Sequence, residues 1–143
     1  MSAAKQLPLR LAAKLADRLC NELSPFCGRI EVAGSIRRRR SFVGDVELVA
    51  IPCTERNEQR DLFGNIIAAT ERNLLDAHLD EMLAAWPGPI FKSRAALFKA
   101  IGLAPDGLPD VQRWGDRYKR FYFLWGGVGA IVPVDLFITT PDN

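Results

Sequence analysis

The 143-residue sequence has little of the chemistry on which several enzyme classes depend. It contains one histidine, His78, so a Ser-His-Asp triad, a Cys-His pair or a multi-histidine metal site would have to use that residue. His78 lies on or beside the apolar side of a helical pattern, and we interpret it as a packing or surface residue. The sequence therefore argues against histidine-based catalysis.

Cysteine and long apolar runs are also scarce. The sequence has three cysteines, Cys20, Cys27 and Cys53. Their odd number and the absence of a CxxC spacing indicate neither a disulfide framework nor a zinc site. Reduced thiols, as in a cytosolic protein, are the expected state. No apolar run reaches transmembrane length, and charges interrupt the N-terminal segment where a signal peptide would be apolar. We expect a cytoplasmic protein with no membrane partner.

Net charge is small as well. At +2 it argues neither for nor against binding to nucleic acid. The distribution is more informative, because four of the nineteen basic residues are consecutive, at positions 37–40. The length, with 48% hydrophobic and 25% charged residues, fits one globular domain spanning residues 1–143.

Hydrophobic periodicity predicts helices and strands in alternating blocks. Helices are predicted over residues 7–24, 71–86 and 93–101. Strands are predicted over residues 29–33, 45–51, 118–125 and 130–139, the last two forming a β-hairpin with its turn at 126–129. Residues 52–61 are expected to form an exposed loop. Phe63, Ile66 and Ile67 are expected to mark a buried return of the chain or the start of the next helix.

The stretch from residue 34 to residue 44 gathers groups that bind phosphate. Gly34 and Ser35 break the first strand, and the missing side chain of Gly34 would let a phosphate approach the backbone. The arginine run fits one tight helical turn or a loop. Ser35 offers a hydroxyl, Arg37 and Arg38 offer guanidinium groups, and Gly44 offers an unobstructed N–H. These donors suit a triphosphate.

Three acids are placed to bind metal ions. Asp45 and Glu47 stand two residues apart in a strand, so both side chains point to one face. Asp135 lies in the middle of an apolar strand, where an isolated carboxylate is costly unless cations balance it. Carboxylate oxygens are ligands that Mg²⁺ prefers, and nucleotidyl transfer uses two such ions. The pattern predicts two Mg²⁺ or Mn²⁺ ions held by these acids.

Each of these signals is weak when taken alone. An Asp-x-Glu pair on a strand is common, an arginine run is usually a solvated surface, and a Gly-Ser pair is most often a turn. The glycines at 126, 127 and 129 lack the ending of a phosphate-binding P-loop. It is the joint spacing of the donors and acids that favours a functional site.

The joint spacing resembles a known signature. Gly34-Ser35-x-Arg37-Arg38-x5-Gly44-Asp45-x-Glu47 is similar to the signature of the nucleotidyltransferase superfamily, in the polymerase beta-like version of the family X DNA polymerase palm domain. Val134-Asp135-Leu136-Phe137 resembles the strand that carries the third catalytic acid of that family. The resemblance implies an α+β fold in which helices pack on one face of a mixed sheet.

The resemblance also implies roles for individual residues. Asp45, Glu47 and Asp135 would be the catalytic metal ligands, and Asp135 would also be the base, or its metal-linked equivalent, for the attacking hydroxyl. The β- and γ-phosphates would be held by donors of the loop, namely Ser35, Arg38 and Gly44, with Gly34 and Arg37 beside them.

The sequence departs from the family pattern in three places. Glu47 stands where family X usually has aspartate, although the wider superfamily accepts glutamate there. Val43 stands where a small polar phosphate contact is common. The family holds the nucleotide's sugar and base with a segment after the third acid, followed by a thumb, and the sequence ends at Asn143. We expect a bare palm or a piece of a longer protein.

The implied function is metal-dependent nucleotidyl transfer from a nucleoside triphosphate to a nucleic-acid 3′ hydroxyl. Two alternatives remain open, namely transfer to a small molecule or protein, and a catalytically silent nucleic-acid-binding domain. Trp114, Tyr118 and Phe121 are interleaved with basic residues in the second half of the chain. This pattern fits a nucleic-acid backbone with stacked bases, and it fits equally an ordinary solvated surface over a buried aromatic strand.

Overall fold

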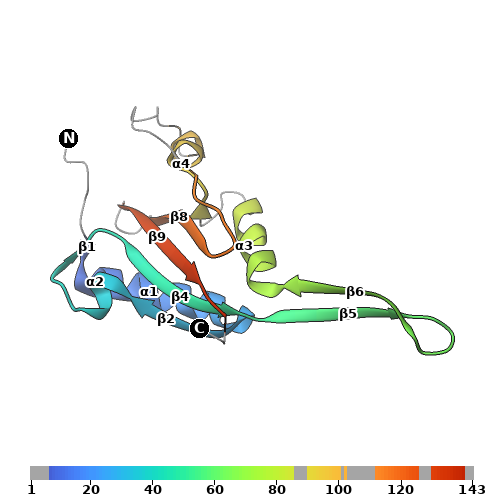
Figure 1. The fold of residues 1–143 in the computed structure, drawn as a ribbon. Coiled ribbons are helices and arrows are strands. Elements are labelled where there is room, and N and C mark those ends of the chain that lie inside the picture. The colour runs from blue at the N-terminus through green and yellow to red at the C-terminus, as the bar shows by residue number, and fades with distance from the viewer. Residues whose placement is uncertain (1–6, 86–89, 101, 103–111, 126–129, 141–143) are drawn as a thin grey trace.

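A mixed five-stranded sheet forms the centre of the computed structural model, which describes residues 7–85, 90–100, 102, 112–125 and 130–140 (Figure 1). The strands follow the order β2-β4-β9-β8-β7. Their bounds are β2 Cys27–Ala33, β4 Val46–Pro52, β7 Ile90–Phe91, β8 Tyr118–Trp125 and β9 Ala130–Ile138. β4 and β9 run parallel, whereas the other neighbouring pairs are antiparallel. The mixed sheet and the antiparallel pairing of residues 118–125 with 130–139 were both predicted.

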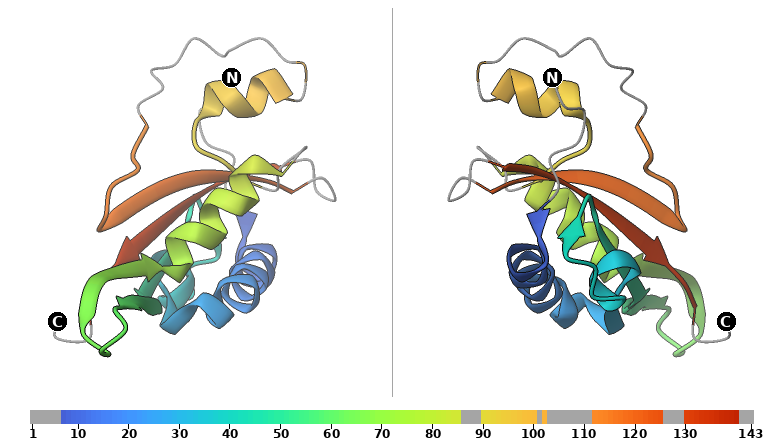
Figure 2. Two further views of the ribbon diagram at one scale, coloured as in Figure 1. Left: turned by 90° about the vertical axis from the view of Figure 1, so that its right-hand side faces the viewer. Right: turned by 90° about the vertical axis from the view of Figure 1, so that its left-hand side faces the viewer.

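Two helices cover one face of this sheet. α1 (Leu9–Leu23) and α3 (Leu74–Ala84) place their apolar side chains in the same core as alternate residues of β4, β8 and β9 (Figure 2). Leu48 and Leu136 of neighbouring strands are both fully buried there. Because successive side chains of a strand alternate between faces, the residues between these buried ones lie on the opposite face. That opposite face carries the candidate acids.

Short elements surround the start of β4. β1 (Leu7–Pro8) pairs with β3 (Phe42–Val43), and one helical turn, α2 (Gly34–Arg37), follows β2 directly. A 3-10 turn (Ser24–Phe26) joins α1 to β2, and α4 (Arg94–Ala100) lies beside β7 and β8. The β1–β3 pair ties the segment that follows the arginine run to the start of α1. The N–H of Leu9 reinforces this link by donating to the Ser41 carbonyl at 2.9 Å.

Several predicted boundaries shift. The first helix starts at Leu9 because residues 7 and 8 join β1, and β2 begins two residues before the predicted strand. The helix predicted over 71–86 begins only at Leu74, since residues 71–73 belong to β6. Asn73 caps this helix, its side chain accepting a hydrogen bond from the N–H of Asp76 at 3.0 Å. Residues 86, 101 and 126–129, including the predicted hairpin turn, lie outside the described residues.

The largest correction concerns residues 52–73. The prediction of a loop over 52–61 was wrong, because β5 (Thr54–Arg60) pairs antiparallel with β6 (Ile66–Asn73) in a long hairpin arm. β5 is solvent-exposed, as predicted for this part of the chain, and the arm projects from the body of the molecule (Figure 1). Phe63, Ile66 and Ile67 are 89%, 47% and 65% exposed, respectively, rather than buried, and none starts a helix. A polar ribbon held by cross-strand pairs shows no apolar alternation, so its sequence does not reveal it.

Among the described residues, no helix is long and apolar enough to cross a membrane.

Candidate metal and nucleotide site

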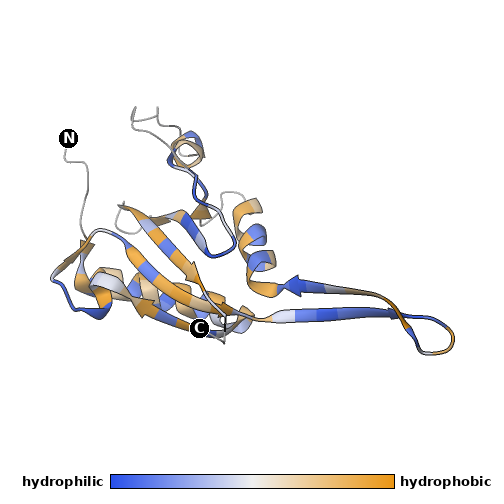
Figure 3. Ribbon diagram, in the orientation of Figure 1, coloured by the Kyte–Doolittle hydropathy of each residue, from blue (hydrophilic) through white to orange (hydrophobic). Residues whose placement is uncertain are grey.

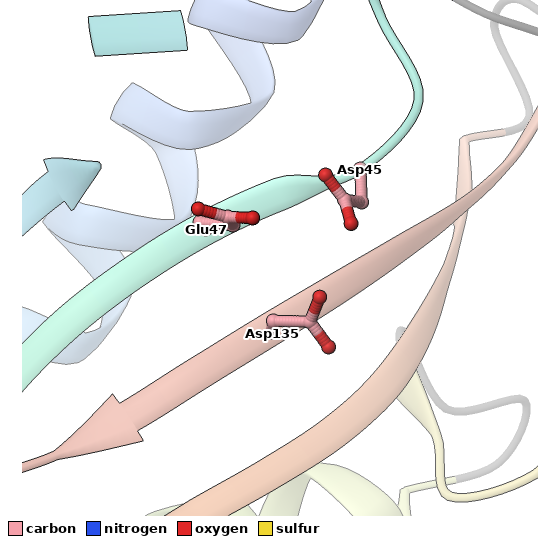
Figure 4. A group of neighbouring side chains, drawn as sticks. All are labelled: Asp45, Glu47 and Asp135. Carbon is pink, nitrogen blue, oxygen red and sulfur yellow. The ribbon is translucent and has the colours of Figure 1, made fainter. Parts of the chain in front are cut away.

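Three carboxylates meet on the open face of the sheet (Figure 4). Asp45 directly precedes β4, Glu47 lies in β4, and Asp135 lies in β9. One oxygen from each of the three lies within 4.8 Å of the others. This is the only such group of histidine, cysteine or acidic side chains within the part of the chain that the structure describes. The cluster is therefore the candidate metal centre.

Strand register explains how acids about ninety residues apart become neighbours. Glu47 and Asp135 are paired directly across the parallel β4–β9 ladder. Val46, Leu48, Val134 and Leu136 beside them are buried in the core, so both acids point to the other face. The burial of the apolar residues in these two strands thus also determines the face to which the acids point.

The acids crowd one another. Burial raises the pKa of the Asp45 carboxyl above its ordinary value, and the nearby charge of Asp135, a hydrogen bond with Asp135 and the charge of Glu47 raise it further. Asp135 is only 7% exposed. Two side chains of β8 partly balance this charge, since Tyr118 donates its hydroxyl to Asp135 Oδ1 at 2.5 Å and Arg120 Nε lies 3.2 Å from the same oxygen.

The Arg120 contact is ionic rather than a well-aligned hydrogen bond, because its buried Nε has no hydrogen-bond partner among the described residues. Its Nη2 also lies 3.8 Å from Asp45 Oδ2. The half-buried Arg120 thus supplies one positive charge to two of the three carboxylates, Asp45 and Asp135. A cluster of this kind, with only oxygen ligands and excess negative charge, fits hard divalent cations such as Mg²⁺ or Mn²⁺. The residues present therefore fit the metal that the sequence predicts.

The phosphate-binding candidates begin directly beside the acids. Ala33, the last residue of β2, pairs with Glu47 across the sheet, so Gly34 comes next to that carboxylate. Gly34 has a backbone φ of +67°. A Cβ at this position would collide with the Glu47 carboxyl group. Glycine is thus required here by backbone conformation and by space together.

The remaining loop candidates occupy the turn that follows. Arg38 Nη2 donates to Ser35 Oγ at 3.5 Å, and the N–H of Arg38 donates to the Gly34 carbonyl at 3.0 Å. Arg37 and Arg38 are exposed, and Ser35 is half-buried. Gly44 is exposed immediately before Asp45, and no atom lies within 4 Å of the place where its Cβ would be. The structure therefore places Gly34 beside Glu47 and Gly44 beside Asp45, and it leaves the side chains of Arg37 and Arg38 exposed.

Sequence reasoning gave no role at the acid cluster to three residues. Tyr118 and Arg120 contact Asp135 directly, and the ring of Phe137 stacks on that of Tyr118 with centroids 5.1 Å apart. Phe137 is 41% exposed and lies two residues after Asp135 on the same face of β9. The register between β8 and β9 would have identified them, because Arg120 pairs with Asp135 and Tyr118 with Phe137.

The aromatic residues named from the sequence separate into different environments. Phe121 is fully buried, and Lys119 beside it is only 4% exposed, so neither can contact a ligand on the open face. The Trp114 ring makes cation–π contacts with two ammonium groups, because Lys92 Nζ lies 4.7 Å and Lys119 Nζ 4.9 Å from its centroid. The three aromatic residues therefore do not share one surface, and Tyr118 instead stacks on Phe137.

No protein-family model matches the chain, and no curated protein matches it in sequence. Among solved structures, the chain is similar to a crystal structure of Leishmania infantum polymerase beta in a ternary P/T complex, with 16% sequence identity and a TM-score of 0.48. The match covers 95% of this chain and 44% of that one, so the chain spans less than half the length of that polymerase. A likeness at this level shows neither a shared family nor a shared activity.

Proposed function

We propose that the chain is a polymerase beta-like nucleotidyltransferase domain, which transfers a nucleotide from a nucleoside triphosphate to a nucleic-acid 3′ hydroxyl. The observation that carries the proposal is the convergence of Asp45, Glu47 and Asp135 beside the Gly34 turn. Asp135 is about ninety residues from the other two acids in the sequence, and the β4–β9 register brings it beside them.

In this proposal the three acids hold two Mg²⁺ or Mn²⁺ ions. Bound there, the ions would supply Lewis-acid stabilisation of the attacking and leaving oxygens. Asp135 would accept the proton of the acceptor hydroxyl. The acceptor oxygen forms its bond to the α-phosphorus, the bond from that phosphorus to the bridging oxygen breaks, and pyrophosphate leaves.

The arginine turn would bind the triphosphate. Arg37 and Arg38 are exposed and supply two of the four consecutive positive charges, while Ser35 and the backbone at Gly34 and Gly44 supply neutral donors. The two guanidinium groups would balance part of the negative charge of the triphosphate, and the neutral groups would add hydrogen bonds. Their role is to fix the phosphates at the edge of the cluster so that the α-phosphorus faces it.

The stacked ring pair beside the acids favours a nucleic-acid acceptor over a small aliphatic one. Phe137 is exposed two residues after Asp135 on the same face of β9, and in this proposal a terminal base of the acceptor stacks on it. Arg120 Nε lies 3.2 Å from Asp135 Oδ1, and the charge of this arginine would attract a phosphate of the acceptor strand. We also propose that residues 1–143 act as one catalytic domain; the cytoplasmic location stays a prediction.

The decisive experiment measures transfer from labelled NTPs and dNTPs with Mg²⁺ or Mn²⁺ present. The acceptors are a primer–template, a single-stranded primer, and a pool of small molecules without nucleic acid. Primer extension is the expected result, and labelling confined to the small-molecule pool would select the alternative acceptor. Asp135→Asn is expected to abolish transfer, whereas Asp80→Asn, a matched change at an exposed position of α3, is expected to leave it unchanged. Absence of both metal binding and transfer in the wild type would contradict the proposal.

A further inference from the structure

Asp135 lies between two side chains of opposite charge. Glu47 of β4 is its partner across one ladder of the sheet, and Arg120 of β8 is its partner across the other. Hydrophilic residues interrupt the otherwise hydrophobic strand β9 (Figure 3), and Asp135, one of them, is only 7% exposed. Water has little access to this carboxylate, so the neighbouring side chains determine its orientation.

Two side chains of β8 reach the same oxygen of this carboxylate. The Tyr118 hydroxyl donates to Asp135 Oδ1 at 2.5 Å, and Arg120 Nε lies 3.2 Å from Oδ1. Within the described residues of β8, no side chain donates a hydrogen bond to Oδ2. The contacts with β8 therefore use one carboxylate oxygen and leave the other for a ligand.

The two contacts differ in how well they fix an orientation. Arg120 Nε has no aligned hydrogen-bond partner among the described residues, and Nη2 of the same guanidinium lies 3.8 Å from Asp45 Oδ2. Arg120 therefore supplies a charge that two carboxylates share. The Tyr118 bond is directional, and its length is at the short end of the range for hydroxyl donors. Tyr118 rather than Arg120 thus fixes the Asp135 carboxylate.

Tyr118 is itself held on both its ring and its backbone. Its ring stacks on that of Phe137, its partner across the β8–β9 ladder, at a centroid distance of 5.1 Å. Its carbonyl accepts from the Gly115 N–H at 2.8 Å. Asp135 is the diagonal neighbour of Tyr118 in this ladder, which a long aromatic side chain can reach. The hydroxyl is therefore presented to Asp135 from a fixed position.

We propose that Tyr118 is a positioning residue for Asp135, in a role that rests on the proposed function. Its hydroxyl holds Oδ1 on the β8 side, which leaves Oδ2 as the oxygen presented to a divalent cation. Tyr118 contacts neither the cation nor the substrate in this role and acts only through the carboxylate. Hydrogen bonds to metal ligands orient them, so loss of this hydroxyl weakens metal binding although every ligand is kept.

Titration calorimetry with Mn²⁺, in the absence of nucleotide, tests this role on the folded chain. Tyr118→Phe removes the hydroxyl and keeps the ring that stacks on Phe137, and it is expected to weaken Mn²⁺ binding about tenfold. Tyr122→Phe is the matched control. Tyr122 is a half-buried tyrosine on the same face of β8, four residues from Tyr118, and it does not contact the acids by a hydrogen bond. It is expected to keep the wild-type affinity.

A double-mutant cycle separates a role through Asp135 from a general effect on the fold. Asp135→Ala removes the carboxylate that Tyr118 contacts, and Asp45 and Glu47 remain to bind Mn²⁺ weakly. Adding Tyr118→Phe to Asp135→Ala is expected to cause no further loss of affinity, because the partner of the hydroxyl is already absent. An equal loss in both backgrounds would overturn the positioning role.

Transfer kinetics distinguish failure of this role from failure of the proposed function. Tyr118→Phe is expected to lower kcat about tenfold and to leave the KM for the nucleoside triphosphate unchanged, because the proposed phosphate donors lie in residues 34–44. Wild-type Mn²⁺ affinity in a folded Tyr118→Phe protein would overturn the role of Tyr118 and leave the proposed function intact. A wild-type chain that neither binds Mn²⁺ nor transfers a nucleotide would overturn both.

Discussion

Gly34 lies so close to the Glu47 carboxylate that a Cβ on Gly34 would overlap it. The glycine closes β2 next to the strand that bears the acid, and its φ of +67° starts the arginine turn. One position therefore links the candidate phosphate loop to the candidate metal centre. A change there is expected to affect metal binding before any substrate is present.

Gly34→Ala is expected to weaken Mn²⁺ binding about tenfold or more, because the added methyl group displaces the Glu47 carboxyl from the other acids. It should also lower the free energy of unfolding by about 1–2 kcal/mol, from the left-handed backbone conformation. Titration calorimetry with Mn²⁺ and urea unfolding measure the two effects. Gly64→Ala is the control, since Gly64 has a φ of +83° with open space around it. Equal metal affinity in the Gly34→Ala and wild-type proteins would contradict the link to Glu47.

Asp45→Asn is expected to separate stability from activity. The substitution removes one of three crowded negative charges, so the melting temperature in metal-free buffer should stay equal or rise. Transfer should fall about a hundredfold or more, because a candidate metal ligand is lost. Differential scanning calorimetry and the transfer assay supply the measurements. A large fall in melting temperature would mean that the cluster has a structural role instead.

Phe137→Ala is expected to raise the KM for a nucleic-acid acceptor about tenfold, since stacking of a base on an aromatic ring contributes about 1–3 kcal/mol. The KM for the nucleoside triphosphate should not change. Phe137→Trp should retain stacking and keep the acceptor KM close to that of the wild type. Phe63→Ala is the control, because Phe63 is an exposed phenylalanine at the distant tip of the arm. An unchanged acceptor KM in Phe137→Ala would show that no base of the acceptor stacks on this ring.

Cys27 is expected to react slowly with iodoacetamide. Burial, followed by the neighbouring Cys53 and Cys20, raises the pKa of its thiol from 9.0 to about 11. Only the thiolate is nucleophilic, so at pH 8 the reactive fraction is about a hundredfold below that of a thiol with the ordinary pKa. The alkylation rate should keep rising with pH up to about 11. Peptide-resolved mass spectrometry over a pH series, with a cysteine peptide as reference, tests this. A rate that levels off near pH 9 would contradict it.

The sequence determined the elements whose side chains alternate between core and solvent. In β4 and β9, buried valines and leucines at every second position indicate the strands and also the direction of Glu47 and Asp135. The α1 and α3 helices were predicted for the same reason, with errors at their ends. A buried face requires apolar residues at regular spacing, so these helices and strands could be predicted from neighbouring residues in the sequence alone.

Only the tertiary structure revealed the features that depend on contacts between residues distant in sequence. The hairpin arm has no buried face, and cross-strand pairing rather than periodicity defines it, so its sequence resembled a loop. The contacts of Tyr118 and Arg120 with Asp135, and the stacking of Phe137, arise from the register between β8 and β9. The space at Gly34 is likewise set by Glu47 on a neighbouring strand. A strand's own residues specify which side chains face outward, but strand pairing determines which other side chains they meet.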